Sequence, residues 1–345
     1  MAITNISSAV SFGEKIFDYA LKLNKLRKSH QPLTAPNCQN TAVNVFIQLS
    51  HMRASYNNSY PTKSLFKTRN IVLASIAWGV LALLYFLLFS AKIPGADGTQ
   101  SRAAWYVIGT NIFEALAYLS AGILCLRNWR SPQIVSDRNV WLAIGIGMLS
   151  YFLGGIFFGY TEIVLKEEPI VSLGDVFFVV TYLFLGVGMI LAVASRRLNL
   201  EKWQWMIVLA IGAFGSALAW LISHQPQGAD ISLEVPSGVE NIAPILSTVY
   251  IVSDVLLLII ATMLLLAFWG GRASLSWRMI AAAAFSLYIA DMWFQYATNW
   301  IPNYQSGEIL EVFWVMSGVL FGMGAALEYD ASLSRSRRVG GRKRA

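Results

Sequence analysis

The stretch AAAAFSLYIADMWFQYATNW, residues 281–300, has the length and apolar character of a membrane-spanning helix. One acid, Asp291, lies inside it, where a carboxylate is energetically unfavourable in hydrocarbon. Apolar runs of about twenty residues, the length that crosses a bilayer, recur along the chain. They lie at about 71–90, 104–126, 140–160, 175–194, 204–223, 246–270, 277–298 and 309–328. The sequence therefore predicts eight transmembrane helices.

The composition of the 345-residue chain supports this prediction. Hydrophobic residues make up 56% of it, and charged residues only 13%. The mean hydropathy is +0.54. A soluble domain normally carries about twice that charged fraction. We therefore expect an all-α integral membrane protein rather than a set of soluble domains.

The placement of basic residues predicts the topology. Lysines and arginines precede the first span, follow the last span and fall in every second loop, whereas the intervening loops contain only Lys92, Arg102 and Lys166. The positive-inside rule then places both termini in the cytoplasm, as an even number of spans requires. The net charge of +7 is explained by topology, so nucleic acid is not expected as a partner.

Three regions follow from this pattern. Residues 1–70 form a polar cytoplasmic extension, in which EKIFDYALKLNKLRK (14–28) is an amphipathic helix or a loosely ordered tail, followed by a linker. Met52 offers an alternative start of the chain. Residues 71–328 form the membrane domain, and residues 329–345 form a basic cytoplasmic tail.

An internal repeat appears when the sequence is compared with itself at a shift of 136 residues. IVLA at 71–74 aligns with IVLA at 207–210, and Trp141 aligns with Trp277. The constant spacing favours duplication, with halves at about 71–200 and 207–328. Each half has four spans, an even number, so we expect two parallel four-helix repeats related by an axis along the membrane normal.

Intramembrane acids and tyrosines define the candidate site. Acids recur with tyrosines at intervals of three or four residues in three spans, which places each pair on one helix face. The predicted ligand-binding set is Asp291, Asp254, Glu114, Tyr288, Tyr250, Tyr118 and Gln295. Counting from the predicted helix ends places these acids in the outer half of the membrane. Two interpretations remain open: an externally accessible pocket, or hydrogen bonds that only fix helix packing.

Two further acids, Asp175 and Glu311, begin their helices and are expected to act as caps. Two GxxxG pairs are also present. Gly155 and Gly159 stand at the repeat positions of Asp291 and Gln295 and predict close helix contact. Gly318 and Gly322 predict packing or a dimer seam.

Several chemistries lack the residues they need. None of the three histidines lies in a span, and the two cysteines form no metal-ligand spacing. No catalytic motif is present, so we expect a protein that is not an enzyme and has no metal site. The sequence names no cofactor.

The stretches YIVSDVLLLIIATMLLLAFWGGRASLSWRMIAAAAFSLYIADMWFQYATNW (250–300) and IVSLGDVFFVVTYLFLGVGMILA (170–192) carry a resemblance. They resemble the multi-span sensory module that precedes GGDEF, EAL or histidine-kinase domains in bacterial signalling proteins. The resemblance covers roughly residues 71–328 and implies a membrane input domain. Only YDASLSRSRRVGGRKRA follows Glu328, so the expected signal passes to a separate protein.

The leading hypothesis is a non-enzymatic bacterial sensory or scaffolding module that contacts the lipid bilayer and a membrane or cytoplasmic protein, with a homodimer as a further expectation. A cation or proton-coupled transporter or channel is the first alternative. An assembly factor or subunit of a bioenergetic membrane complex is the second. The expected location is the bacterial cytoplasmic membrane, or the thylakoid membrane of a cyanobacterium.

Overall fold

The structure is a computed structural model that describes residues 68–94, 100–165, 171–195, 200–223, 242–268, 274–302 and 304–342. The N-terminal extension, its amphipathic helix and its linker lie outside the described residues. Most of the predicted loop between the fifth and sixth spans does so too.

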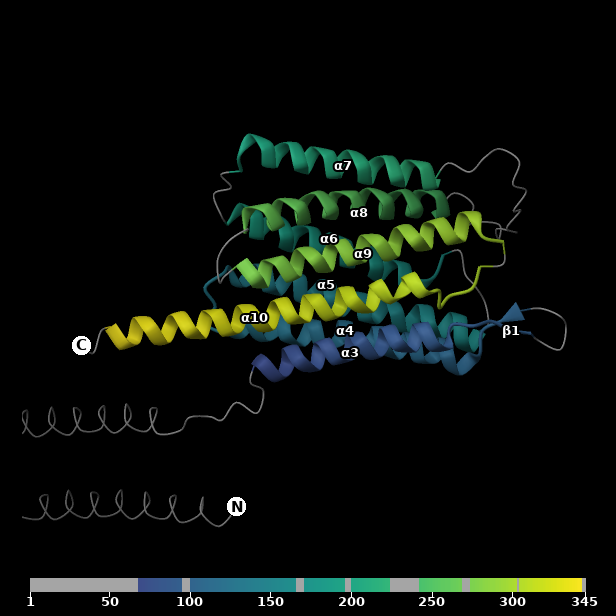
Figure 1. The fold of residues 1–345 in the computed structure, drawn as a ribbon, viewed down its shortest axis with the longest axis horizontal. Helices are drawn as coiled ribbons and strands as arrows, with labels where there is room; N and C mark the ends of the chain where they lie inside the picture. The colour runs from purple at the N-terminus through teal and green to yellow at the C-terminus, as the bar shows by residue number, and fades with distance from the viewer. Residues whose placement is uncertain are drawn as a thin grey trace, which may run out of the picture. The chain divides into compact units, whose positions relative to one another are not determined.

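Eight long α-helices make up nearly all of the described chain (Figure 1). They are α3 (Thr68–Phe89), α4 (Ala104–Arg130), α5 (Arg138–Tyr160), α6 (Leu173–Ala194), α7 (Lys202–Ser223), α8 (Ile242–Ala267), α9 (Ser274–Trp300) and α10 (Val312–Arg342). Short elements lie between them: the antiparallel strands β1 (Ile93–Pro94) and β2 (Gln100–Ser101), the π-helix η1 (Thr161–Leu165) and the 3₁₀-helix η2 (Ile309–Glu311). The all-α fold class is confirmed.

Seven of these helices are long and apolar enough to cross a membrane. The eighth, α9, has 27 residues, which at about 1.5 Å per residue is also sufficient length. Its composition is more polar, because it includes Arg278, Asp291 and Gln295. α10 continues beyond the predicted end of the last span to Arg342, through most of the predicted basic tail.

The outer surface is apolar, as contact with lipid requires. Leu88 of α3 is 68% exposed, and Met206 and Phe214 of α7 are 70% and 69% exposed. Such side chains would be unfavourable on a water-facing surface of this extent. The protein is therefore a multi-pass, membrane-embedded helical bundle.

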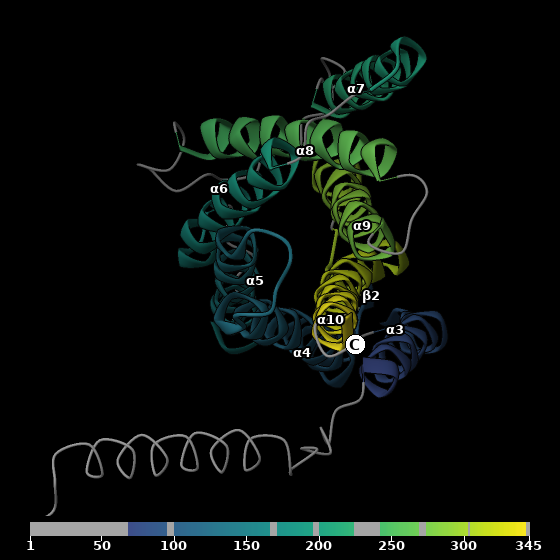
Figure 2. The same cartoon turned by 90° about the vertical axis from the view of Figure 1, so that its left-hand side faces the viewer.

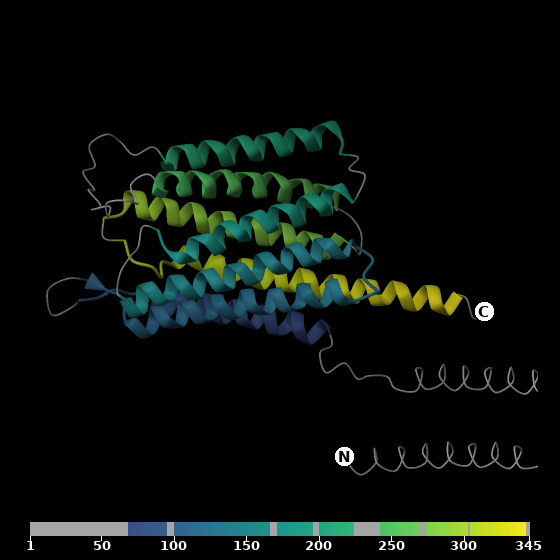
Figure 3. The same ribbon diagram turned by 180° about the vertical axis from the view of Figure 1, so that it is seen from behind.

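Six helices form a closed ring in the view along the bundle (Figure 2). Contacts run in the order α4, α5, α6, α8, α9, α10 and back to α4. α3 lies outside the ring against α10 and α4, and α7 lies outside it against α8 and α9. Figure 3 shows the bundle from behind, with α10 extending beyond the other helices toward the C-terminus.

Consecutive helices run in opposite directions, so their ends gather at two ends of the bundle (Figure 1). The connections α4–α5, α6–α7 and α8–α9 lie at one end, which we call the basic end. The helix termini there include Arg130, Arg138 and Lys202. At the end that we call the far end, α3 is followed by α4, α5 by α6, α7 by α8 and α9 by α10.

Part of the main hydrophobic core lies in the basic-end half of the ring. Trp141, Ile144, Met148, Leu185 and Met189 are fully buried there. Trp141 of α5 packs on Trp277 of α9 with ring centroids 5.6 Å apart. Asn128 adds a hydrogen bond from α4 to the carbonyl of Ala325 in α10, at 2.8 Å.

The two GxxxG pairs behave differently from one another. A Cβ on Gly318 would lie 2.9 Å from the Cβ of Ala117 in α4, so this glycine permits close packing of α10 on α4. The packing interpretation is confirmed, and a dimer seam at this position is wrong because α4 occupies it. Gly159 packs tightly on Asn111, whereas Gly155 has open space where a Cβ would lie, so the predicted contact at Gly155 is wrong.

Candidate functional site in the helix ring

Asp291 of α9 is held by two hydrogen bonds across the ring. The hydroxyl of Tyr182 on α6 donates to its Oδ2 at 2.6 Å. The indole nitrogen of Trp314 on α10 donates to its Oδ1 at 2.8 Å. Each carboxyl oxygen therefore has a donor, an arrangement that stabilises the ionised form.

Asp254 of α8 is the neighbouring acid, and its surroundings are different. Its side chain is buried, with 1% relative exposure. Neither of its oxygens has a hydrogen-bond partner within the described part of the chain. The Asp291 carboxyl and the Tyr182 hydroxyl lie close enough to interact with it, although neither forms a hydrogen bond of ordinary geometry. A buried carboxyl without a donor is costly, since buried polar groups are nearly always paired.

Glu114 of α4 completes the set of three acids. It is half-buried and lies beside Tyr151 of α5 and within electrostatic range of Asp291. Tyr151 stacks on Tyr118 with ring centroids 3.7 Å apart. The hydroxyls of Tyr118 and Ser317 are buried, and neither has a hydrogen-bond partner in the described segments.

Within the described segments, no lysine or arginine is among the groups that act on Glu114, Asp254 or Asp291. The sequence has no lysine or arginine between Lys202 and Arg272, or between Arg278 and Arg335. The charged groups that act on Asp254 and Asp291 are other acids and tyrosines. In this setting a buried carboxyl is stable when it is protonated, or when a cationic ligand pairs with it.

Three of the other predicted site residues make contacts between helices. Tyr250 donates its hydroxyl to Oδ1 of Asp175 at 2.7 Å, which joins α8 to α6. Gln295 accepts a hydrogen bond from Ser247 at 3.1 Å, which joins α9 to α8. Tyr288 donates to the carbonyl of Gly215 in α7 at 2.9 Å, away from the carboxyl of Asp291.

The depth of Asp254 differs from the sequence estimate. α8 begins at Ile242 rather than at residue 246, so Asp254 lies twelve residues from its start. At about 1.5 Å per residue this distance is about 18 Å. Asp254 is therefore near the middle of α8, farther from the start of its helix than the sequence-based count of eight residues.

Asp175 and Glu311 act as helix caps, as predicted. Oδ2 of Asp175 accepts a hydrogen bond from the backbone N–H of Ser172 at 2.6 Å. Oε2 of Glu311 accepts one from the N–H of Gly307 at 2.7 Å. Asp175 also reaches Tyr250 through its other oxygen, so it does more than cap a helix.

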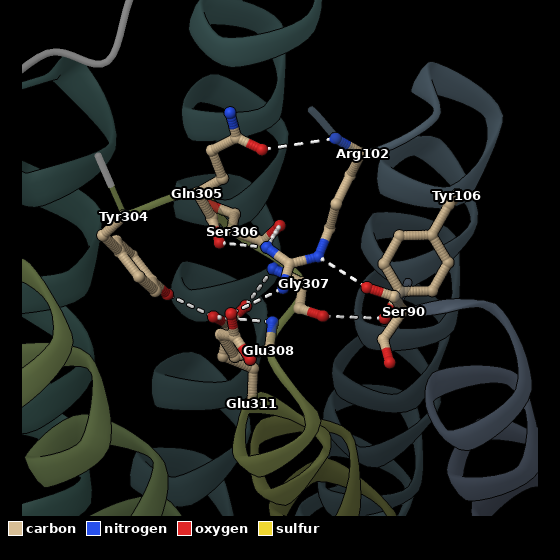
Figure 4. Close-up of polar contacts among 9 residues, drawn as sticks. All are labelled: Ser90, Arg102, Tyr106, Tyr304, Gln305, Ser306, Gly307, Glu308 and Glu311. Atoms are coloured by element: carbon tan, nitrogen blue, oxygen red, sulfur yellow. Dashed lines mark hydrogen bonds and ion pairs between the residues drawn. The ribbon is translucent and has the colours of Figure 1, made fainter. Parts of the chain in front are cut away.

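A second polar cluster lies at the far end of the bundle (Figure 4). We call it the Arg102 cluster, and it consists of Ser90, Arg102, Tyr106, Tyr304, Gln305, Ser306, Gly307, Glu308 and Glu311. The Arg102 side chain has only 3% relative exposure. Its guanidinium donates to the carbonyls of Ser90, Gln305 and Ser306 and pairs with Glu308 at 2.6 Å.

Gly307 gives this cluster its shape. Its φ is +100°, which only glycine adopts readily. A Cβ there would lie 2.7 Å from Cε1 of Tyr106. Tyr106 instead donates its hydroxyl to the Gly307 carbonyl at 2.8 Å. Tyr304 donates to Glu311, and burial followed by the charge of that carboxylate raises the pKa of Tyr304.

Sequence reasoning missed four important residues. Tyr182 lies seven residues after Asp175, on the same face of α6, and that spacing could have identified it. Tyr151, Trp314 and Arg102 gave no such signal, because their partners lie on distant helices. Among the described residues, no group of three or more His, Cys, Asp or Glu side chains is placed to hold a metal ion.

Comparison of the chain with protein-family models, with curated protein sequences and with solved structures gave no match. The interpretation of the site therefore depends on its chemistry.

Proposed function

We propose that this protein is a non-enzymatic membrane module that senses protonation of, or a cationic ligand at, the acids inside its helix ring, and passes the signal to a partner protein. The observation that carries the proposal is Asp254, which is buried beside Asp291 without a hydrogen-bond donor. A purely structural acid would be expected to have its donors in place. Functional acids are the usual explanation for carboxyls at this depth.

The link between site and partner runs through α10. Trp314, in its first turn, binds Asp291, and the helix continues from there to Arg342. A change in the charge of the acid pair alters the strength of the bond from Trp314. Any resulting shift of α10 would reach the basic C-terminal residues directly, since no break separates the two ends of this helix.

The finer architecture forms part of the proposal. We infer two duplicated halves with both termini in the cytoplasm of a bacterium, in its cytoplasmic membrane. In support, α4–α5–α6 and α8–α9–α10 pack in the same serial order, and contacts α6–α8 and α10–α4 close the ring. The basic residues between helices favour the cytoplasmic placement of the basic end.

Hydrogen exchange of the purified full chain in lipid nanodiscs tests the sensory proposal. We expect amide protection in residues 329–342 to change with pH in the wild type and to be independent of pH in Asp254→Asn. Asp330→Asn is the matched control, because it removes an exposed acid from α10 without touching the ring acids. It should show the same pH response as the wild type. A pH response that persists in Asp254→Asn would contradict the proposal.

Proton- or cation-coupled transport is the second candidate. The observation in its favour is that α4, α8 and α9 each contribute an acid to the same group of neighbours. Transport predicts solute accumulation in proteoliposomes that Asp291→Asn abolishes. Sensing without transport predicts no solute accumulation with the wild type or with Asp291→Asn.

A further inference from the structure

Open space lies on the inward face of α5. Gly155 follows Tyr151 by four residues and therefore shares its helix face. Tyr151 is within electrostatic range of Asp291 on α9, which lies opposite α5 in the ring (Figure 2). In the described residues, no neighbouring atom lies within 4 Å of the position that a Cβ on Gly155 would occupy. The ring interior therefore has unfilled space beside Tyr151.

Two acids near Tyr151 are half-buried, although they lie well inside the bundle. Glu114 is ten residues from the far-end start of α4, and Asp291 is nine residues from the far-end terminus of α9. At about 1.5 Å per residue these distances are about 13–15 Å. The two acids act on each other electrostatically, although α10 lies between their helices in the ring. Their exposed surface therefore faces the ring interior.

Fully buried side chains lie deeper in the ring. Met148 precedes Tyr151 on the same face of α5, toward the basic end, and is fully buried. Asp254, about 18 Å from the start of its helix, is 1% exposed. The accessible space therefore belongs to the far-end half of the ring. We call this space the ring hollow and define it by Glu114, Tyr151, Gly155 and Asp291.

Aromatic rings and hydrogen-bonding groups lie next to the ring hollow. Phe178 of α6 packs on Tyr151 with ring centroids 5.1 Å apart. The hydroxyl of Tyr118 is buried, has no partner within the described segments and is within electrostatic range of Glu114 and Asp291. Each oxygen of Asp291 accepts one hydrogen bond and retains a further lone pair. Carboxylates attract a cation, and aromatic rings stabilise a cation that has an organic body.

These side chains favour an organic cation over a metal ion. Calcium and magnesium take six or more oxygen ligands in a protein site. Among the described residues, no group of three or more His, Cys, Asp or Glu side chains is placed to hold such an ion. A protonated amine needs only hydrogen-bond acceptors for its N–H groups and an apolar surface for its carbon atoms. The ring hollow offers both.

We propose that the ring hollow binds a protonated amine with a small apolar body. Its ammonium group donates hydrogen bonds to the carboxylates of Asp291 and Glu114, and its apolar part packs against Tyr151 in the space beside Gly155. This inference rests on the proposed function and names the chemical class of the cationic ligand at that site.

Isothermal titration calorimetry of the full chain in lipid nanodiscs tests this proposal, with n-butylammonium and benzylammonium chloride as probes. We expect saturable binding of at least one probe, beyond the heat measured with empty nanodiscs. Potassium chloride and the uncharged 1-butanol and benzyl alcohol should not reproduce it. Asp291→Asn and Glu114→Gln should each weaken binding at least about tenfold, the loss of one charge-assisted hydrogen bond. Asp330→Asn, which removes an exposed acid from α10, is the matched control and should bind as the wild type does.

Gly155→Leu separates binding from folding. Its side chain occupies the open space beside Tyr151, so we expect binding to weaken at least about tenfold while the unfolding temperature without amine stays close to that of the wild type. No saturable binding to the wild type, or equal binding to Asp291→Asn, would overturn this inference. The proposed function fails on a different result, a pH response of residues 329–342 that persists in Asp254→Asn.

Discussion

The Arg102 cluster and the ring acids are both groups of wholly or partly buried polar side chains in an apolar protein, yet their hydrogen bonding differs. Arg102 donates to three backbone carbonyls and to one carboxylate. Asp254 has no donor, and Tyr118 and Ser317 nearby have buried hydroxyls without partners in the part of the chain that the structure describes. The difference separates two uses of buried polarity. The first set of residues joins segments of the fold, and we propose that the second set binds a proton or a cation.

The largest effect on the free energy of unfolding should come from replacing Arg102. Replacing it with alanine removes the donors that Arg102 supplies to the Glu308 carboxylate and to three partly buried carbonyls, and with them the link between α3, α4 and the α9–α10 connection. We expect the free energy of unfolding to fall by about 3–5 kcal/mol, measured by thermal or denaturant unfolding in detergent. Arg102→Lys, which keeps the charge but not the planar set of donors, should cost less. A loss below about 1 kcal/mol, typical of surface pairs, would contradict the assignment.

Gly307 should show the next largest effect. Gly307→Ala places a Cβ at a φ of +100° against Tyr106, so we expect a loss of about 1–3 kcal/mol in the free energy of unfolding. Gly155→Ala is the matched control, since open space surrounds its position in α5. Alanine there should be neutral or stabilise by up to about 1 kcal/mol. Similar unfolding temperatures for both variants would show that the loop does not need its glycine.

Replacing Asp254 should not lower the free energy of unfolding, in contrast to the replacements of Arg102 and Gly307. Asp254→Leu removes a buried carboxyl that has no donor and fills its place with an apolar side chain. Replacing such groups is often neutral or stabilising by about 1–4 kcal/mol, and we expect no loss in the free energy of unfolding. The variant should nevertheless lose the pH response of residues 329–342. Destabilisation comparable to that of Arg102→Ala would mean that Asp254 is part of the structural framework.

Replacing Tyr304 should have a smaller effect on the free energy of unfolding, and this effect should depend on pH. Burial raises its pKa above the unfolded value, which is about 10. The stabilisation is therefore fully present below pH 10, approximately the unfolded pKa, and is lost as pH rises further. Unfolding curves from pH 8 to 11 should show a steeper fall for the wild type than for Tyr304→Phe. Parallel curves would contradict the buried position of this phenol.

Helix length and charge placement are local properties, which explains why the sequence predicted the helices so well. The spacing of three and four residues also identified the helix face on which each of Glu114, Asp254 and Asp291 lies, but not which helices would bring those faces together. The partners of these acids were not, since Tyr182 and Trp314 lie 109 and 23 residues from Asp291. The open space at Gly155 and the role of Arg102 likewise depend on which helices become neighbours.

Modification by a hydrophobic carbodiimide, which reacts with protonated carboxyls in apolar surroundings, tests the central claim most directly. We predict that peptide mass spectrometry of the treated full chain will find the adduct on Asp254, at a level above that on Asp291. An unmodified Asp254, in protein in which the reagent has modified another carboxyl, would contradict a protonated and accessible acid in the ring.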